Sequence, residues 1–186
     1  MAEIVSRIAA WTSAQRQHLF STDQRAWLRD PDHEASLLLR DGRYYLRRLK
    51  KYVYPYEARV LQPGQPTMKS WAFDNGEKRQ APVVVIHASG EEGHVDNPTI
   101  GIDNVFHVEA PVSLEAGQTL MVGQDKTAGL YDRKGRFIRR IELSSGLPQL
   151  EVGPHNLSFD GRTDVNSSVN LKIEIKLSGN EELLHQ

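Results

Sequence analysis

Residues 169–177, VNLKIEIKL, alternate apolar and polar side chains without interruption. Successive side chains of a β-strand point to opposite faces, so this alternation predicts a strand with one buried face and one solvated face. Similar short apolar runs recur from residue 57 onward, separated by turn-forming pairs such as Asn75-Gly76 and Lys134-Gly135. The other predicted strands cover 57–62, 68–74, 82–88, 104–109, 111–114, 118–122, 127–132, 136–143 and 155–160. This succession, with no helical periodicity between the strands, predicts a mainly-β chain folded as an antiparallel jelly-roll β-sandwich.

The first 55 residues have a different pattern, which predicts a small N-terminal helical segment. Apolar residues recur there at spacings of three and four, which is typical of a helix. The clearest examples are Tyr45, Leu46, Leu49, Tyr52 and Val53. The predicted organisation is a helical segment over 1–55, a β-sandwich domain over 56–178 and a tail over 179–186. The helical segment is either an appendage or the end of a preceding region, so we expect it to pack on the sandwich or on a neighbour.

Composition excludes several classes of protein. The chain of 186 residues carries 23 Lys and Arg against 24 Asp and Glu, a formal net charge of −1, so an overall basic nucleic-acid-binding protein is not expected. It contains no cysteine, which excludes disulfides, a cysteine zinc site and a thiol nucleophile. No apolar run approaches the roughly 20 residues of a membrane-spanning helix. Residues 1–12 lack the apolar core of a signal peptide, so localisation stays open between an exported module, extracellular or periplasmic, and a cytoplasmic protein.

No catalytic motif is present, and we expect no catalytic residue. The chain has neither a G-x-S-x-G nucleophile motif nor a glycine-rich phosphate loop. Glu91 and Glu92 are adjacent in a loop, whereas a glycosidase needs two carboxyl groups facing each other across a cleft. A solvated acidic loop is therefore the favoured interpretation of this pair.

Two clusters raise the possibility of a metal ion. His87, His94, Asp96 and His107 combine imidazoles with a carboxylate, as in metal-dependent β-barrel enzymes, but they lack an H-x-H pair or an H-E-x-x-H helix. Histidines scattered over strands and loops are the favoured interpretation. The oxygen-bearing residues of DGRTDVNSS are of the type that calcium prefers, yet they lack the register of a calcium loop, so a structural calcium remains an alternative to a polar hairpin loop. These residues are Asp160, Asp164 and Asn166.

Aromatic residues on predicted strands are the candidate ligand-binding residues. A flat exposed ring can hold the C–H face of a sugar, and Trp71 and Tyr131 are the candidates for such a platform. The alternative is that both rings belong to the core. Polar planar groups that can bind sugar hydroxyls are Arg133, Asp96, Asn97 and Asn104.

Six segments taken together resemble a known family. They are SWAFDNG (70–76), VDNPTIGID (95–103), APVSLEAGQTLM (110–121), AGLYDRKGRFI (128–138), LPQLEVGPHNLSF (147–159) and VNLKIEIKL (169–177). In this order they resemble the C-terminal jelly-roll β-sandwich modules of bacterial glycoside hydrolases and related polysaccharide-degrading proteins. Such modules are similar in fold to galactose-binding-like, carbohydrate-binding domains.

The resemblance implies a non-catalytic ancillary module with carbohydrate as its ligand and a neighbouring catalytic domain or partner chain. In such modules the sugar contacts often lie in loops at one end of the sandwich, which points to residues 91–97 and 123–127. Two alternatives stay open, because a fold alone does not choose a function. One is a structural or assembly module, such as a spacer or a phage-type appendage, in which Trp71 and Tyr131 would both be buried. The other is the metal-dependent β-barrel enzyme.

Overall fold

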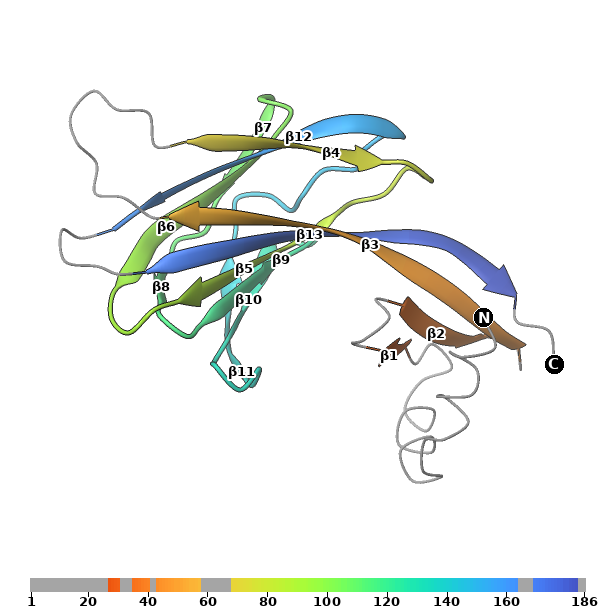
Figure 1. The fold of residues 1–186 in the computed structure, drawn as a ribbon, viewed down its shortest axis with the longest axis horizontal. Helices are drawn as coiled ribbons and strands as arrows, with labels where there is room; N and C mark the ends of the chain where they lie inside the picture. Colours follow the sequence, from red (N-terminus) through yellow and green to blue (C-terminus); the bar gives the residue numbers. More distant parts are fainter. Residues whose placement is uncertain (1–26, 31–34, 41–42, 58–67, 164–168, 184–186) are drawn as a thin grey trace. The chain divides into compact units, whose positions relative to one another are not determined.

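The structure is a computed structural model that describes residues 27–30, 35–40, 43–57, 68–163 and 169–183 (Figure 1). Within these residues every regular element is a β-strand, which confirms the mainly-β prediction. The strands are β1 (Trp27–Asp30), β2 (Ala35–Arg40), β3 (Arg43–Glu57), β4 (Lys69–Asn75), β5 (Val83–Ser89), β6 (His94–Ile102), β7 (Phe106–Glu109), β8 (Ser113–Glu115), β9 (Thr119–Val122), β10 (Thr127–Tyr131), β11 (Phe137–Glu142), β12 (Gly153–Arg162) and β13 (Asn170–Leu183). In these described ranges no helix is long and apolar enough to cross a membrane.

The strands form two antiparallel sheets. The large sheet has eight strands in the order β1-β2-β3-β13-β5-β9-β10-β11. The small sheet has five strands, in the order β4-β12-β6-β7 with β8 paired to β6. In Figure 1, β4, β6, β7 and β12 form one layer and β5, β9, β10 and β13 the other. This arrangement is a β-sandwich, and the finer jelly-roll assignment stays a prediction.

The core lies between the two sheets and follows from the alternation in the sequence. Leu171, Ile173 and Ile175 of β13 are buried, and Leu157 and Phe159 of β12 belong to the same apolar cluster. Removing a side chain of this size from water stabilises the folded state by ~1.5–3 kcal/mol. The two inner faces therefore hold the sandwich together and leave the outer faces available for binding.

The structure corrects the helical prediction for residues 27–55. The described part of this segment is β1, β2 and most of β3, and residues 1–26 lie outside the described residues. β2 pairs with β3 so that Arg40 lies opposite Arg43, and the two residues between them in sequence are Asp-Gly, a favoured hairpin pair. The tyrosines of β3 favour a strand as well, because Tyr52, Tyr54 and Tyr56 share one face only when the period is two.

From residue 68 on, the predicted strands overlap β4, β5 and β7 to β13, whereas β6 is missing from the prediction. The pair Asn97-Pro98 in the middle of β6 is typical of a turn, and proline cannot donate a ladder hydrogen bond. The predicted strand 57–62 lies almost entirely outside the described residues. Residues 94–102 nevertheless form the strand β6, because they pair with β12, β7 and β8.

The described residues divide into two compact units. The described residues of 51–177 form one unit, and the described residues of 1–50 and 178–186 form the other. The long strands β3 and β13 contribute residues to both units. The predicted domain limits, 1–55, 56–178 and 179–186, stay a prediction.

Candidate functional site

An irregularity in the pairing of β6 with β12 creates the candidate site. Asp160 of β12 lies opposite Thr99, and Arg162 lies opposite Asp96, so two residues of β6 face the single Gly161. These two residues are Asn97, whose φ of 46° is positive, and Pro98. A bulge of this kind redirects side chains, and here Asp96 and Thr99 share the outer face although they are three residues apart.

Gly161 permits this local geometry. A Cβ atom at this position would lie 2.7 Å from Cγ1 of the buried Val95 and 3.2 Å from the ring of Phe159. A side chain at 161 would therefore push β12 away from β6 at the bulge. The bulge depends on glycine for close packing, because nothing larger fits beneath it.

Pairing with β7 and β8 completes two rows of polar side chains across the outer face of the small sheet. Thr99 lies between Asp160 of β12 and Glu109 of β7. Asp96 lies between Arg162 of β12 and Ser113 of β8. Adjacent strands are ~4.8 Å apart, so each row spans about 10 Å of backbone. These rows surround a small cavity of about 90 Å³, which we call the polar cup, lined by Asp96, Asn97, Thr99, Glu109, Asp160, Gly161 and Arg162.

The polar cup contains more negative than positive side chains. Three carboxylates, from Asp96, Glu109 and Asp160, face one guanidinium, that of Arg162. Asp96 accepts a hydrogen bond from the Ser113 hydroxyl, and its Oδ2 lies 3.3 Å from Nε2 of His94. The carboxylate of Asp160 has a buried oxygen, Oδ1, with no hydrogen-bond partner in the part of the chain that the structure describes.

Asp160 contributes to the lining of the polar cup and also has a buried, unpartnered oxygen. A buried acceptor without a donor destabilises the fold by ~1–3 kcal/mol. The neighbouring Asn97 and Arg162 supply donors, so the cup can both accept and donate. Hydroxyl groups match such a mixed lining, because each is a donor and an acceptor at once.

The structure brings together two of the predicted ligand-binding residues and separates the others. Asp96 and Asn97 both line the polar cup. Asn104 lies in the turn after β6, on the order of 20 Å further along the strand at about 3.3 Å per residue. Tyr131 and Arg133 lie on and after β10, which belongs to the large sheet. Sequence reasoning did not single out Thr99 and Arg162, and it considered Glu109 only beside the histidines, since only the strand pairing places these residues near Asp96.

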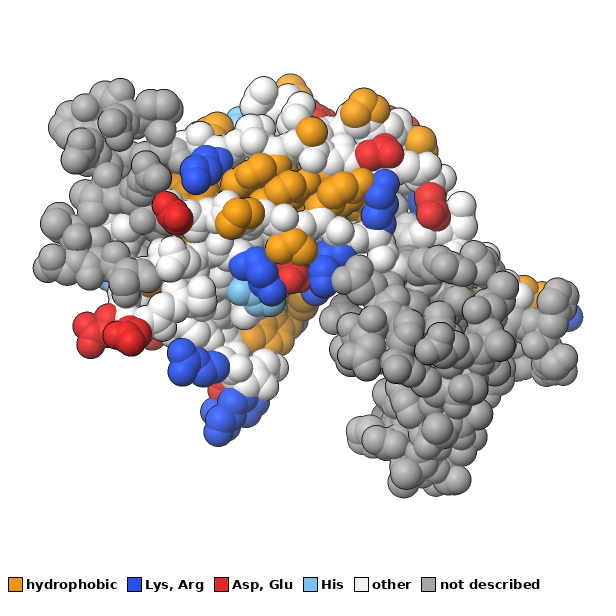
Figure 2. All heavy atoms as spheres, in the orientation of Figure 1, with side chains coloured by type: hydrophobic (Ala, Val, Ile, Leu, Met, Phe, Trp, Pro, Cys, Tyr) orange, Lys and Arg blue, Asp and Glu red, His pale blue; other side chains and the backbone are white. Residues whose placement is uncertain are grey.

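Trp71 lies at the edge of the small sheet and is half-buried rather than freely exposed. Its indole stacks on the ring of Tyr54, with ring centroids 5.1 Å apart and an angle of 14° between the planes. The edge of Tyr56 approaches it from a second direction at 6.5 Å. Figure 2 shows hydrophobic side chains gathered along the line between β3 and β4. One face of the predicted platform is therefore already occupied.

The histidines of the metal-site hypothesis lie in different sheets. His87 belongs to β5 of the large sheet, whereas His94 and Asp96 on β6 and His107 on β7 belong to the small sheet. Among the residues that the structure describes, no group of three or more His, Asp or Glu side chains is placed to hold a metal ion. Of the calcium hypothesis, only Asp160 can be placed, because Asp164 and Asn166 lie outside the described residues.

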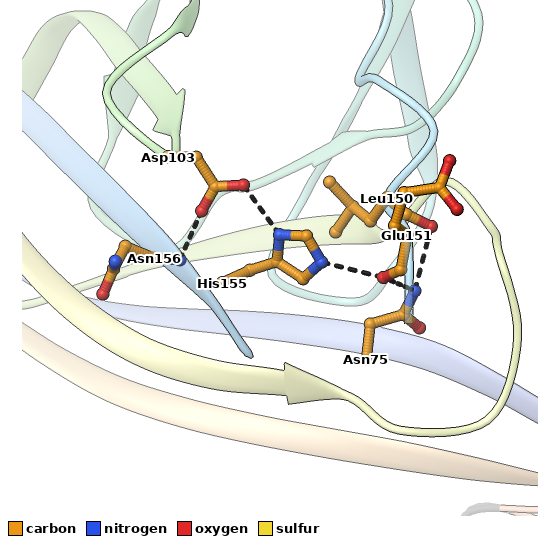
Figure 3. Close-up of polar contacts among 6 residues, drawn as sticks. All are labelled: Asn75, Asp103, Leu150, Glu151, His155 and Asn156. Carbon is orange, nitrogen blue, oxygen red and sulfur yellow. Dashed lines mark hydrogen bonds and ion pairs between the residues drawn. The ribbon is translucent and has the colours of Figure 1, made fainter. Parts of the chain in front are cut away.

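A second polar cluster lies at the other end of β6 and β12 and involves His155 (Figure 3). Asp103 accepts from the backbone N–H of Asn156 at 2.7 Å, and its second oxygen lies 2.7 Å from Nδ1 of His155. Nε2 of His155 lies 2.8 Å from the carbonyl oxygen of Glu151. Both ring nitrogens therefore face acceptors, an arrangement that favours the doubly protonated imidazolium.

The His155 cluster is structural rather than catalytic. A catalytic histidine presents one ring nitrogen to a nucleophile, but both nitrogens of His155 are bound within the fold. Asn75 fixes the same loop, donating to the carbonyl oxygens of Leu150 at 3.1 Å and Glu151 at 2.8 Å. Burial lowers the pKa of His155, but the hydrogen bonds to Asp103 and to the Glu151 carbonyl outweigh it and raise the pKa above its ordinary value.

Comparison with known proteins adds no relative to this geometry. No protein-family model matches the chain, and the comparison with curated proteins found no match.

Proposed function

We propose that this protein is a non-catalytic carbohydrate-binding β-sandwich module and that the polar cup is its sugar site. The observation that carries the proposal is the convergence of Asp96, Asn97 and Asp160 on one small cavity, together with the buried, unpartnered oxygen of the Asp160 carboxylate. The resemblance of residues 66–177 to galactose-binding-like jelly-roll modules supports the same function. The ancillary role, next to a polysaccharide-degrading domain, is part of this proposal.

The chemistry of the polar cup favours a polyhydroxylated ligand over an ion. Three carboxylates repel an anion, and the described residues offer no set of three metal-ligating side chains. Glu109 and Asp160 lie on either side of Thr99, a separation that one sugar ring with its hydroxyls can bridge. Carboxylate oxygens accept from the hydroxyls while Arg162 donates to them, so orientation comes from hydrogen bonds.

Recognition in this proposal depends on polar groups rather than on Trp71. Tyr54 covers one face of the indole, and Trp71 lies on β4, beyond β12 from the strand that carries Asp96. A shallow polar site of this kind binds weakly by itself. Tethering it to a catalytic domain raises the effective concentration of the polymer, which is how such a module contributes to degradation.

The test is affinity electrophoresis of the purified chain in gels containing neutral polysaccharides, followed by calorimetry with oligosaccharides of any polymer that retards it. Asp160→Asn removes the charge of the unpartnered carboxylate while keeping its shape. The expected result is a loss of affinity of about 10-fold or more, since a charged hydrogen bond contributes ~1.5–3 kcal/mol. Glu142→Gln is the matched control, because Glu142 is an exposed carboxylate on β11 of the other sheet.

Two outcomes would overturn the proposal. One is that no polysaccharide retards the wild-type protein, which would favour the alternative function of a structural or assembly module. The other is retardation that Asp160→Asn and Glu142→Gln weaken equally, which would place the sugar site elsewhere on the molecule. A circular dichroism melt of each variant establishes that the comparison is between folded proteins.

A further inference from the structure

The hairpin formed by β10 and β11 carries a dense group of basic residues. Residues 133–140 contain five Lys or Arg side chains, all exposed. They are Arg133, Lys134, Arg136, Arg139 and Arg140. Figure 2 shows Lys and Arg side chains gathered at the end of the molecule where the hairpin lies. The chain as a whole has a formal net charge of −1, so this concentration of positive charge is local.

Most of this charge has no acidic partner in the part of the chain that the structure describes. Arg136 pairs with Asp132, with Nε 2.6 Å from Oδ2. The other four basic residues form no ion pair with the described residues. Unneutralised like charges on one hairpin repel one another, and a bound anion relieves that repulsion.

The turn that carries the charges is rigidly built. Asp132 Oδ1 accepts from the backbone N–H groups of Lys134 and Arg136, both at 2.9 Å. The N–H of Gly135, whose φ is 73°, donates to the carbonyl oxygen of Asp132 at 2.9 Å. These hydrogen bonds hold the pKa of Asp132 below its ordinary value, so the carboxylate stays charged and the turn stays closed. The basic side chains are thus presented from a fixed base.

Exposed apolar side chains accompany the charges. Phe137 is 59% exposed and Ile138 is 45% exposed, and Ile138 is the extra residue of a bulge in β11, since Tyr131 lies opposite Phe137 and Leu130 lies opposite Arg139. Charged residues on an edge strand often have the sole role of preventing aggregation. Exposed Phe and Ile side chains favour aggregation, so that role does not explain this hairpin. The combination of basic and apolar groups therefore indicates a binding surface.

Tyr131 adds a ring that is held flat on the sheet. A Cβ atom at Gly129 would lie 2.8 Å from Cε2 and 2.9 Å from the hydroxyl oxygen of Tyr131, so the ring covers the glycine. The edge of Phe137 contacts it, with ring centroids 5.7 Å apart and an angle of 71° between the planes. The sequence named Tyr131 and Arg133 as ligand-binding residues, and the hairpin places both among the other basic residues.

We infer that the β10–β11 hairpin binds an acidic polysaccharide, one that carries carboxylate or sulfate groups along its chain. This inference rests on the proposed carbohydrate-binding function and names the polymer class. A ring held flat on the sheet stacks on the C–H face of a sugar. Arg140 lies opposite Gly129 and therefore shares the face of Tyr131, so its guanidinium pairs with an acidic substituent, while the other basic side chains raise the local positive potential. The hairpin and the polar cup lie on different sheets, so the two sites act on separate parts of the polymer.

Two other polyanionic partners, double-stranded nucleic acid and a lipid bilayer, fit the hairpin less well. Double-stranded nucleic acid carries one charge per ~1.7 Å, and the acidic surroundings of a single basic hairpin repel such a dense charge. A bilayer would require the apolar residues at the tip, but the tip is the charged turn 132–136, and Phe137 and Ile138 lie behind it on β11. A polysaccharide with more widely spaced charges avoids both conflicts.

The test uses affinity electrophoresis of the full chain with polygalacturonate, neutral dextran and single-stranded DNA as separate probes. Arg139→Gln combined with Arg140→Gln removes two of the unpaired charges. The expected result is a loss of polygalacturonate affinity of about 10-fold, because two cations that attract the carboxylates of the polymer are removed. The matched control is Lys69→Gln combined with Arg79→Gln, which removes the same charge from exposed residues of and after β4.

Three outcomes decide the inference. Loss of retardation in the Arg139/Arg140 variant but not in the control supports it. Equal weakening in both variants overturns it, since the effect would then be one of net charge. DNA that retards the protein as strongly as polygalacturonate also overturns it and assigns the hairpin to nucleic acid. The Asp160→Asn variant separates the two proposals, because it reports on the polar cup and leaves the hairpin unchanged.

Discussion

The hydroxyl of Tyr54 donates a hydrogen bond of 2.8 Å to the carbonyl oxygen of Ala72, while its ring stacks on Trp71. Tyr52 does the same one step along: its hydroxyl donates to the carbonyl oxygen of Asp74 at 3.1 Å and accepts from the Asp74 N–H at 3.2 Å. Ala72 and Asp74 belong to β4, the edge strand of the small sheet. Tyrosine hydroxyls thus form hydrogen bonds with backbone groups of an edge strand that would otherwise be open to pairing with another strand.

Tyr54→Phe is predicted to destabilise the fold by ~1 kcal/mol, because it leaves the Ala72 carbonyl without its donor. Urea denaturation followed by tryptophan fluorescence measures this change. Tyr131→Phe is the control and should change the free energy of unfolding by less than ~0.5 kcal/mol, since the Tyr131 hydroxyl has no hydrogen-bond partner among the described residues. A Tyr54→Phe protein as stable as the wild type would show that water replaces the hydroxyl at no cost.

Trp71→Ala is predicted to lower stability by ~2–4 kcal/mol, because Trp71 packs against the core and against two tyrosine rings. Urea denaturation followed by circular dichroism measures the change, because this variant lacks the tryptophan of the sandwich. Any sugar binding that Trp71→Ala abolishes must therefore be checked against the fraction of folded protein. Binding that survives in the folded fraction agrees with a site at the polar cup, whereas its complete loss from a fully folded variant would return Trp71 to the role of platform.

Asp160→Asn is predicted to raise the free energy of unfolding by ~1 kcal/mol, even though it weakens sugar binding. The wild-type carboxylate has a buried oxygen with no partner, and a neutral amide is less costly to desolvate there. Thermal melts of the wild type and the variant without ligand measure the difference. A loss of stability instead would mean that Asp160 has a structural role, and the carboxylate would then no longer mark a binding site.

The raised pKa of His155 predicts that the folded protein loses stability in alkaline solution. Its pKa is raised in the folded protein, so its contribution is complete below the unfolded pKa of about 6.5 and is lost as the pH rises through the folded value. Asp103, the Glu151 carbonyl and Asp74 all favour the charged ring. Urea denaturation at several pH values between about 5.5 and 9 should show a decline of ~1 kcal/mol that is absent in His155→Gln. His107→Gln, which removes an exposed histidine of β7, should retain the decline.

Glu174 predicts a second pH effect, at the acid end. This carboxylate is 5% exposed on the outer face of β13, with Lys172 Nζ at 3.0 Å, Lys176 Nζ at 3.3 Å and His87 Nε2 at 3.5 Å. Burial raises its pKa, but these cations outweigh burial and lower the pKa to about 2. Its contribution is therefore present above the unfolded pKa of about 4.3 and is lost as the pH falls from there toward 2.

Glu174→Gln should reduce stability at neutral pH by ~1–3 kcal/mol, because three cationic or ionisable groups lose their shared partner. It should also flatten the acid limb of the stability curve, which circular dichroism titration from pH 6 to pH 2 measures. Glu142→Gln, at an exposed position, should leave both unchanged. An acid limb that is identical in the wild type and Glu174→Gln would contradict the assignment.

The sequence alone determines that the chain from residue 68 on is built of strands, because alternation is a local property. VNLKIEIKL needs no partner to show which residues are buried, and Leu171, Ile173 and Ile175 are buried as predicted. The absence of cysteine and of catalytic motifs is likewise a property of the sequence. Asp96 and Asn97 could be named as candidate binding residues from their chemistry and their position near a predicted loop.

Tertiary structure alone decides where those residues act. Residues 43–57 satisfy a helical spacing and a strand alternation at the same time, and pairing with β2 and β13 selects the strand. Asp160 joins Asp96 only because β12 pairs with β6 around a bulge, and no local pattern encodes a contact between residues so far apart in sequence. Strand pairing forms backbone hydrogen bonds between residues that are distant in the sequence. The polar cup is therefore a property of the assembled sheet and of no single segment.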